Sequence, residues 1–282
     1  MSEETAELWI TGFWRRIGAF AIDLLLLGLL GFGLGSVLAS TFVEMGGWGR
    51  LVGFIIALIY FGLLNSEIGK GQTVGKRLLK IKVVDANNQA IAVPKSMLRY
   101  SILGIPFFLN NAQFSIEVLT SPMMYLLSLV LFGGLFSTLY LYIFNRNTRQ
   151  SLHDLIVKTY VVNDMVSPQS VTPIWKTHVY VTAAIIIAAA IVPYFTLELA
   201  KQQPFAQMLT VQDVLAKEPG VMYVLVQDGK TFSSENETTY ISAQVFINEN
   251  KVNDKETGLE LARKIKSTFT ESVDRNFIIV SL

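Results

Sequence analysis

Long apolar stretches alternate with short polar segments along most of the chain. A membrane-spanning helix needs about 20 consecutive apolar residues. The stretches 17–38, 123–144 and 178–197 reach that length. The stretch 48–64 is shorter, and 97–119 becomes polar in its second half. The pattern predicts an α-helical multi-pass membrane protein in which these last two spans are marginal.

Basic residues in the loops predict how the chain is threaded. Lys and Arg collect on the cytoplasmic side of membrane proteins. Arg15 and Arg16 precede the first stretch, and the segments 65–95 and 145–176 are both basic. Two loops on the same side need an even number of crossings between them, so 97–119 must cross together with its successor. The N-terminus is therefore predicted inside, and the last span carries the rest of the chain outside.

The last part of the chain, 198–282, has the pattern of a small α+β domain. An apolar run at 221–226 ends at an Asp-Gly turn signal, and 239–247 is rich in β-branched and aromatic residues. Apolar residues recur at helical spacing over 257–269, and 277–282 is another apolar run. We expect a three-stranded sheet covered by one helix.

Composition agrees with a membrane protein and excludes several classes. Only 16% of the residues are charged, against about 25% in soluble domains. The absence of cysteine excludes disulfides and thiolate catalysis, and two histidines are too few for a His-rich metal site. No nucleophile elbow, dinucleotide fingerprint or pair of catalytic carboxylates stands out. We therefore expect no enzyme activity, no cofactor, no metal and no nucleic-acid partner.

One carboxylate, Asp23, interrupts the first apolar stretch. An ionised side chain at the centre of a span costs about 2.5–3.5 kcal/mol, so it must protonate, pair with a cation or line a wet cavity. Arg16 precedes Asp23 by seven residues, which places both within roughly 20° of one helical face. Arg99, at the start of the third span, is a second cationic candidate. We expect neighbouring cations to neutralise Asp23.

Two polar stretches complete the picture. Residues 145–162, "NRNTRQSLHDLIVKTYVV", predict a short interfacial helix followed by a strand, with Asp154 near the basic start of the first span. Residues 69–85, "GKGQTVGKRLLKIKVVD", predict a basic turn and a strand, because their spacing does not fit a phosphate-binding loop. Three interfacial basic residues of these stretches are expected to attract anionic lipids of the inner leaflet: Lys76, Arg77 and Arg149.

Together, these stretches resemble the RDD family of bacterial multi-pass membrane proteins over about residues 10–163. The resemblance rests on an Arg seven residues before an Asp, on "GQTVGKRLLKIKVVD", on Arg99 opening the next apolar segment, and on "QSLHDLIVKTYVV". It implies that Arg16, Asp23 and Asp154 are the signature positions. For some members the family implies sodium/proton antiport.

The expected organisation has four parts. They are an RDD-type membrane domain at 1–163 with four helices, a cytoplasmic linker at 164–177, a fifth span at 178–197, and an exterior α+β domain at 198–282.

Two functions stay open. The first is transport of H⁺ or Na⁺ in the bacterial inner membrane, with a charge network of Arg16, Asp23, Arg99 and Asp154. Glycines in the first span would let copies of the chain pack closely as a homo-oligomer. The second is a non-catalytic envelope accessory protein whose exterior domain binds a protein partner.

Overall fold

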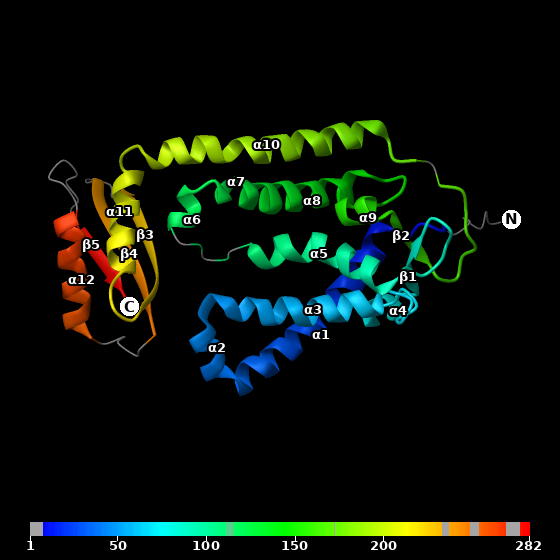
Figure 1. Ribbon diagram of the computed structural model, residues 1–282, viewed down its shortest axis with the longest axis horizontal. Helices are drawn as coiled ribbons and strands as arrows, with labels where there is room; N and C mark the ends of the chain where they lie inside the picture. The colour runs from blue at the N-terminus through cyan, green and yellow to red at the C-terminus, as the bar shows by residue number, and fades with distance from the viewer. Residues whose placement is uncertain are drawn as a thin grey trace. The chain divides into compact units, whose positions relative to one another are not determined.

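The computed structural model describes residues 8–110, 112, 114, 116–171, 173–232, 237–248, 254–268 and 277–282. The chain divides into two compact units, one formed by 1–112 and 125–192 and the other by 113–124 and 193–282. Figure 1 shows the elements of both.

Long apolar helices make up most of the first unit. Its helices are α1 (Phe13–Val37), α2 (Ala39–Met45), η1 (Gly46–Trp48), α3 (Gly49–Leu64), α5 (Val93–Leu109), α7 (Met123–Ser128), the π-helical η2 (Leu129–Gly133) and α8 (Gly134–Phe144). Helix α10 (Lys176–Ala200) follows them in the chain. In the part of the chain that the structure describes, four runs are long and apolar enough to cross a membrane: Phe13–Val37, Ala39–Leu64, Met123–Phe144 and Lys176–Ala200.

The predicted helix over 97–119 is wrong in its bounds. Helix α5 begins earlier, at Val93, with a proline in its first turn, and it ends at Leu109. Asn110 then adopts an extended backbone, and the short helix α6 (Ile116–Thr120) is a separate element. A proline favours a helix start, and the polar residues after Leu109 do not continue the apolar pattern. Helix α5 therefore has 17 residues, or about 25 Å of rise.

The helices of the first unit run up and down, so that four of their ends meet (Figure 1). The start of α1, the end of α3, the start of α5 and the end of α8 lie near the same end of the unit. Short elements gather there: α4 (Val74–Leu78), β1 (Ile81–Asp85), α9 (Leu152–Val157) and β2 (Thr159–Asn163). We call this the polar end of the unit, because most of its buried polar side chains lie there.

Strands β1 and β2 form a two-stranded antiparallel sheet at the polar end, in which Ile81 pairs with Asn163 and Asp85 with Thr159. Val83 packs with Ala19 of α1 in one apolar cluster, while Trp9 covers the other side of the strands. The predicted strands after the basic turn and after the short helix are thus confirmed, and they bond to each other across the sequence.

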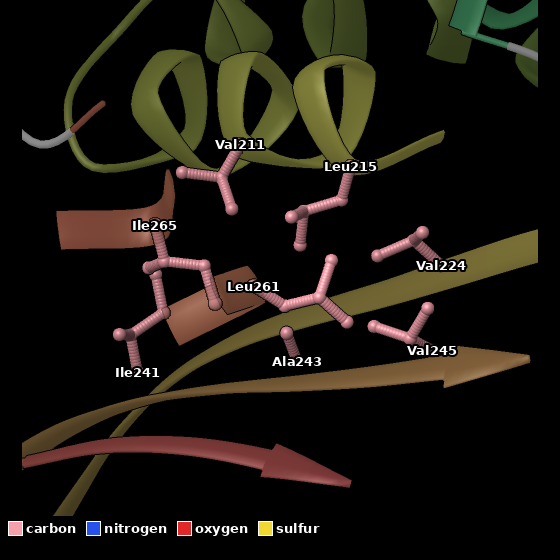
Figure 2. Close-up of a cluster of buried hydrophobic side chains, with 8 residues drawn as sticks. All are labelled: Val211, Leu215, Val224, Ile241, Ala243, Val245, Leu261 and Ile265. Atoms are coloured by element: carbon pink, nitrogen blue, oxygen red, sulfur yellow. The ribbon is translucent and has the colours of Figure 1, made fainter. Parts of the chain in front are cut away.

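The second unit is a sheet covered on one face by two helices. The sheet has the order β3 (Val221–Phe232), β4 (Glu237–Ile247), β5 (Phe277–Ser281), antiparallel between the first two and parallel between the last two. Helices α11 (Phe205–Ala216) and α12 (Lys255–Thr268) supply Val211, Leu215, Leu261 and Ile265 to the core, as Figure 2 shows. The predicted three-stranded sheet is confirmed, with one covering helix more than expected. Phe269, the last residue of the predicted helix, lies outside the described residues.

The turn predicted at Asp228-Gly229 is wrong. Strand β3 continues through both residues, with Asp228 paired to Ile241 and Gly229 to Tyr240. A Cβ on Gly229 would lie 2.5 Å from the ring of Tyr240. The glycine therefore serves a close approach between strands rather than a reversal of the chain.

Candidate functional site

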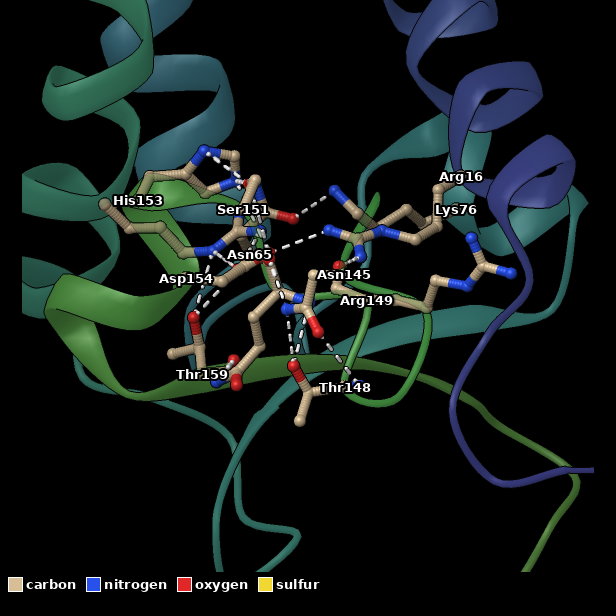
Figure 3. Close-up of polar contacts among 12 residues, drawn as sticks. Arg16, Asn65, Lys76, Asn145, Thr148, Arg149, Ser151, His153, Asp154 and Thr159 are labelled. Carbon is tan, nitrogen blue, oxygen red and sulfur yellow. Dashed lines mark hydrogen bonds and ion pairs between the residues drawn. The ribbon is translucent and has the colours of Figure 1, made fainter. Parts of the chain in front are cut away.

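Asp154 is the centre of a buried charge network at the polar end. Its side chain is fully buried near the start of α9. Arg16 Nη2 donates to Oδ2 at 2.7 Å, and Arg99 donates to Oδ1 from Nη2 at 2.6 Å and from Nε at 2.9 Å. The hydroxyl of Thr159 donates to Oδ1 at 3.0 Å. Figure 3 shows how Arg16 and Thr159 approach this carboxylate.

The charges around Asp154 fix its protonation state. Burial raises the pKa of Asp154, but the guanidinium groups of Arg99 and Arg16 lower it by more than burial raises it. The pKa therefore lies well below its usual range. Burial, together with the same two arginines, lowers the pKa of the neighbouring His153 to about 3. Asp154 is therefore a permanent anion and His153 is neutral near pH 7, so neither exchanges a proton there.

Arg16 is held by three elements at once. Besides Asp154, it donates from Nη1 to the backbone carbonyl of Arg149, and its guanidinium carbon lies 4.9 Å from the ring centroid of Tyr142. The sequence predicts an interfacial cation at Arg149, and the structure adds that its backbone carbonyl, in the loop after α8, accepts this hydrogen bond from Arg16. A cation over an aromatic face is stabilised by the ring quadrupole.

Asp23 forms a second, separate site. It is fully buried on α1 and accepts hydrogen bonds from Tyr60 Oη at 2.7 Å, Thr73 Oγ1 at 2.5 Å and the backbone N–H of Gly75 at 2.8 Å. Three neutral donors, one from α3 and two from the N-cap and first turn of α4, thus satisfy the carboxylate.

The expected pairing of Asp23 with a guanidinium is wrong. Arg16 and Arg99 both bond to Asp154, and no ion pair to Asp23 is found among the residues that the structure describes. The reason lies in helix geometry. Side chains lean toward the N-terminus of their helix, so Arg16, which precedes Asp23 on α1, extends away from it.

Gly75 lets helix α4 approach α1 closely enough for its backbone to reach Asp23. A Cβ at this position would lie 2.0 Å from the carbonyl oxygen of Ala19. Thr73 is the N-cap of α4, and its hydroxyl oxygen accepts from the N–H of Lys76. Residues 69–85, which were predicted to form a basic turn and a strand, therefore also supply two of the hydrogen bonds to Asp23.

Lys76 lies between the two sites. It is half-buried, and its Nζ donates to Asn65 Oδ1 at 2.7 Å (Figure 3). Burial and the nearby Arg99 lower the pKa of Lys76 to about 7. Its neighbour Arg77 is exposed. Lys76, one of the three predicted interfacial basic residues, therefore titrates near neutral pH.

A partly open cavity of about 420 Å³ lies beside the network. Its polar lining comes from Arg16, Asn65, Lys76, Arg99 and His153. The rest of its lining is mainly apolar and comes from α1, α3, α5, α8 and the two short strands. Pockets of this size, mostly apolar with a few placed polar groups, are typical ligand sites.

Sequence patterns do not identify all the residues of these sites. The partners of Asp23 come from two other segments, and their only signal is a Thr-Val-Gly sequence at a helix start together with a tyrosine inside a span. Asn145, Thr148 and Gln150 form a buried hydrogen-bonded loop under Asp154. The proximity of Asp154 to the basic start of the first span, by contrast, agrees with the structure.

The fold and this site define an integral membrane protein with a buried Arg–Asp network. The family model of the RDD family matches residues 10–158, which hold Arg16, Asp23, Arg99 and Asp154. The chain belongs to the RDD family. No match was found among curated proteins or among solved structures. Residues after 158, including the whole β3-β4-β5 sheet, lie outside the matched region.

Proposed function

We propose that the protein is a non-enzymatic, proton-linked transporter of the bacterial cell membrane, in which the cavity takes the solute and Lys76 takes the proton. The observation that carries the proposal is the position of Lys76, which lines the cavity and is close enough to Asp154 and Asp23 for both charges to act on its ammonium. Intramembrane ionisable groups that border a cavity are functional candidates.

Proton exchange is assigned to Lys76 because the two carboxylates are occupied. Both oxygens of Asp154 and both oxygens of Asp23 accept hydrogen bonds. A sodium ion would have to displace these donors, so the arrangement favours H⁺ over Na⁺ as the coupling ion. The pKa of Lys76 near 7 lets it gain and lose a proton under physiological conditions.

The orientation is part of the same proposal. We place the polar end, with its basic loops, on the cytoplasmic side, which puts the N-terminus inside and the C-terminal unit outside. The up-and-down order of α1, α3, α5 and α8 supports it, because two crossings separate the end of α3 from the end of α8. If the short helix α5 is counted as a crossing, this orientation has the even number of crossings that the basic loops require.

The test is proton movement in everted vesicles that contain the full chain. Vesicles are energised to form a pH gradient and pulsed with NaCl, KCl or sodium octanesulfonate, a permanent anion that carries no proton itself. We expect at least one pulse to collapse the gradient, with an activity midpoint near pH 7. Lys76→Gln and Lys76→Arg should both abolish the response, Gln because it carries no titratable group and Arg because it stays charged and cannot release a proton.

Arg77→Gln is the matched control, since it removes a charge from the same short helix at an exposed position. It should leave the response intact. A chain that inserts normally but gives no response to any of the three pulses contradicts transport.

One observation favours a second function, that of an envelope accessory protein. On the sheet face opposite α11 and α12, the second unit exposes Phe246, Phe277 and Ile279 by 48%, 60% and 45%. Exposed apolar side chains on one face are typical of a protein contact. A non-transporting chain whose C-terminal unit binds an envelope protein through this face would establish that role.

A further inference from the structure

The charged side chains that line one side of the cavity carry more positive than negative charge. Arg16, Arg99 and Lys76 line it. When Lys76 is protonated, these three cations face two carboxylates: Asp154, which bonds to both arginines, and Asp23, whose charge acts on Lys76 without a direct bond. His153, which also lines it, adds no negative charge. A buried charge without a counter-charge is costly. An anion at this end would therefore be stabilised.

Donors remain available for such an anion. Arg99 uses Nε and Nη2 for Asp154 and Thr159, and Nη1 has no partner among the described residues. Lys76 uses one of its three N–H donors for Asn65. An oxyanion held by an ammonium and a guanidinium would make the charge-assisted hydrogen bonds that such groups form best.

The rest of the cavity has the opposite character. Ile17 and Phe20 of α1, Leu103 of α5, and Leu135 and Leu139 of α8 line it. Leu139 is 55% exposed, so the apolar wall reaches the outer surface of α8, a helix within a candidate membrane span. A small hydrated anion would leave this apolar lining uncovered. A hydrocarbon chain would cover it and continue toward the bilayer.

We propose that the cavity binds an anionic amphiphile, with its oxyanion head beside Lys76 and Arg99 and its acyl chain between α1 and α8. This deepens the proposed function, on which it rests for the role of the cavity, by naming the chemical class of the solute. The titration of Lys76 supports it, because protonation of Lys76 would strengthen binding of the head and deprotonation would weaken it.

Native mass spectrometry of the full chain, released from a neutral maltoside detergent, tests the assignment. The probes are oleate, phosphatidylglycerol, phosphatidylcholine and inorganic phosphate. We expect one bound oleate or phosphatidylglycerol, with affinity about tenfold above that for zwitterionic phosphatidylcholine, because the choline cation of phosphatidylcholine offsets the charge of its phosphate and is repelled by Lys76 and Arg99. Which of the two anionic probes binds more tightly distinguishes a free fatty acid from a phospholipid.

Two variants separate binding at this cavity from general attraction to lipid. Lys76→Gln should remove the tenfold preference, while Arg77→Gln should keep it. Leu135→Trp should weaken binding of every amphiphile by filling the apolar part, without touching the charged residues. Thermal unfolding of each variant checks that it is folded.

Three outcomes would overturn the assignment. They are equal affinity for phosphatidylcholine and phosphatidylglycerol, unchanged preference in Lys76→Gln, and competition by inorganic phosphate at the same concentrations as oleate. Binding as expected without a proton response in vesicles would refute transport and leave the ligand assignment standing.

Discussion

Asp154→Asn is expected to destabilise the membrane unit by about 3–5 kcal/mol, the range for breaking a buried ion pair by removing one partner. The substitution keeps the size of the side chain and, among the residues that the structure describes, removes the only negative charge in direct contact with Arg16 and Arg99. Its amide nitrogen would also face a guanidinium donor in place of an acceptor. Two buried cations would then be left with a neutral neighbour.

Thermal unfolding of the purified protein in detergent measures this effect. Asp164→Asn is the control, because Asp164 pairs with Lys82 at 2.9 Å in a partly exposed position, where an ion pair contributes about 1 kcal/mol or less. Equal shifts in the unfolding temperature for the two variants would show that Asp154 is not the counter-ion of the arginines.

The ion pairs between Asp154 and its two arginines also determine how the stability of the protein changes in acid. The folded-state pKa of Asp154 is lowered, so its contribution to stability is complete above the ordinary value of 3.8 and declines as the pH falls toward the lowered value. The Asp154 network should therefore persist in mild acid, and the Asp154→Asn deficit should stay constant between pH 5 and pH 7.

Substitution of Asp23 by Asn is expected to cost little stability, and substitution by Ala is expected to cost much more. In Asp23→Asn, the remaining oxygen still accepts from Tyr60 and Gly75, and the new amide donates to the hydroxyl of Thr73. In Asp23→Ala, all three groups lose their acceptor, and each buried unsatisfied group costs about 1–3 kcal/mol. The loss should reach about 3 kcal/mol or more for Ala and stay below about 1.5 kcal/mol for Asn.

Comparing the two substitutions in the unfolding and vesicle assays separates a structural role of Asp23 from a charge-dependent one. A structural acceptor predicts that Asp23→Asn keeps both stability and proton response. If Asp23→Asn is folded but inactive, the charge of Asp23 is needed for the response, and a purely structural role for Asp23 fails.

The pattern of apolar stretches along the chain predicted most of the helices, because a membrane span is recognised by the length and composition of its apolar stretch. It also predicted the strands at 81–85 and 159–163, where β-branched residues follow a turn and a short helix. It failed for 97–119, where length was counted across Asn110, although the chain leaves the helix there. Gly229 shows the same limit, since a glycine can serve a turn or a close approach and the sequence alone does not distinguish them.

The partners of the two carboxylates show what sequence reasoning lacks. Spacing along α1 placed Arg16 and Asp23 on one face, and the structure keeps them on the buried face of that helix. Partner choice, however, depends on segments far away in the chain, such as Gly75 for Asp23 and Arg99 for Asp154. The face of a helix determines which of its residues point inward, and the folded loops determine which groups those residues contact.

The most direct test of the central claim, that Arg16 neutralises Asp154 and not Asp23, is a pair of double-mutant cycles on unfolding free energy. One cycle combines Arg16→Gln with Asp154→Asn, and the other combines Arg16→Gln with Asp23→Asn. We predict a coupling of about 2 kcal/mol in the first cycle and additivity within about 0.5 kcal/mol in the second. Strong coupling in the second cycle with additivity in the first would contradict the two-site arrangement.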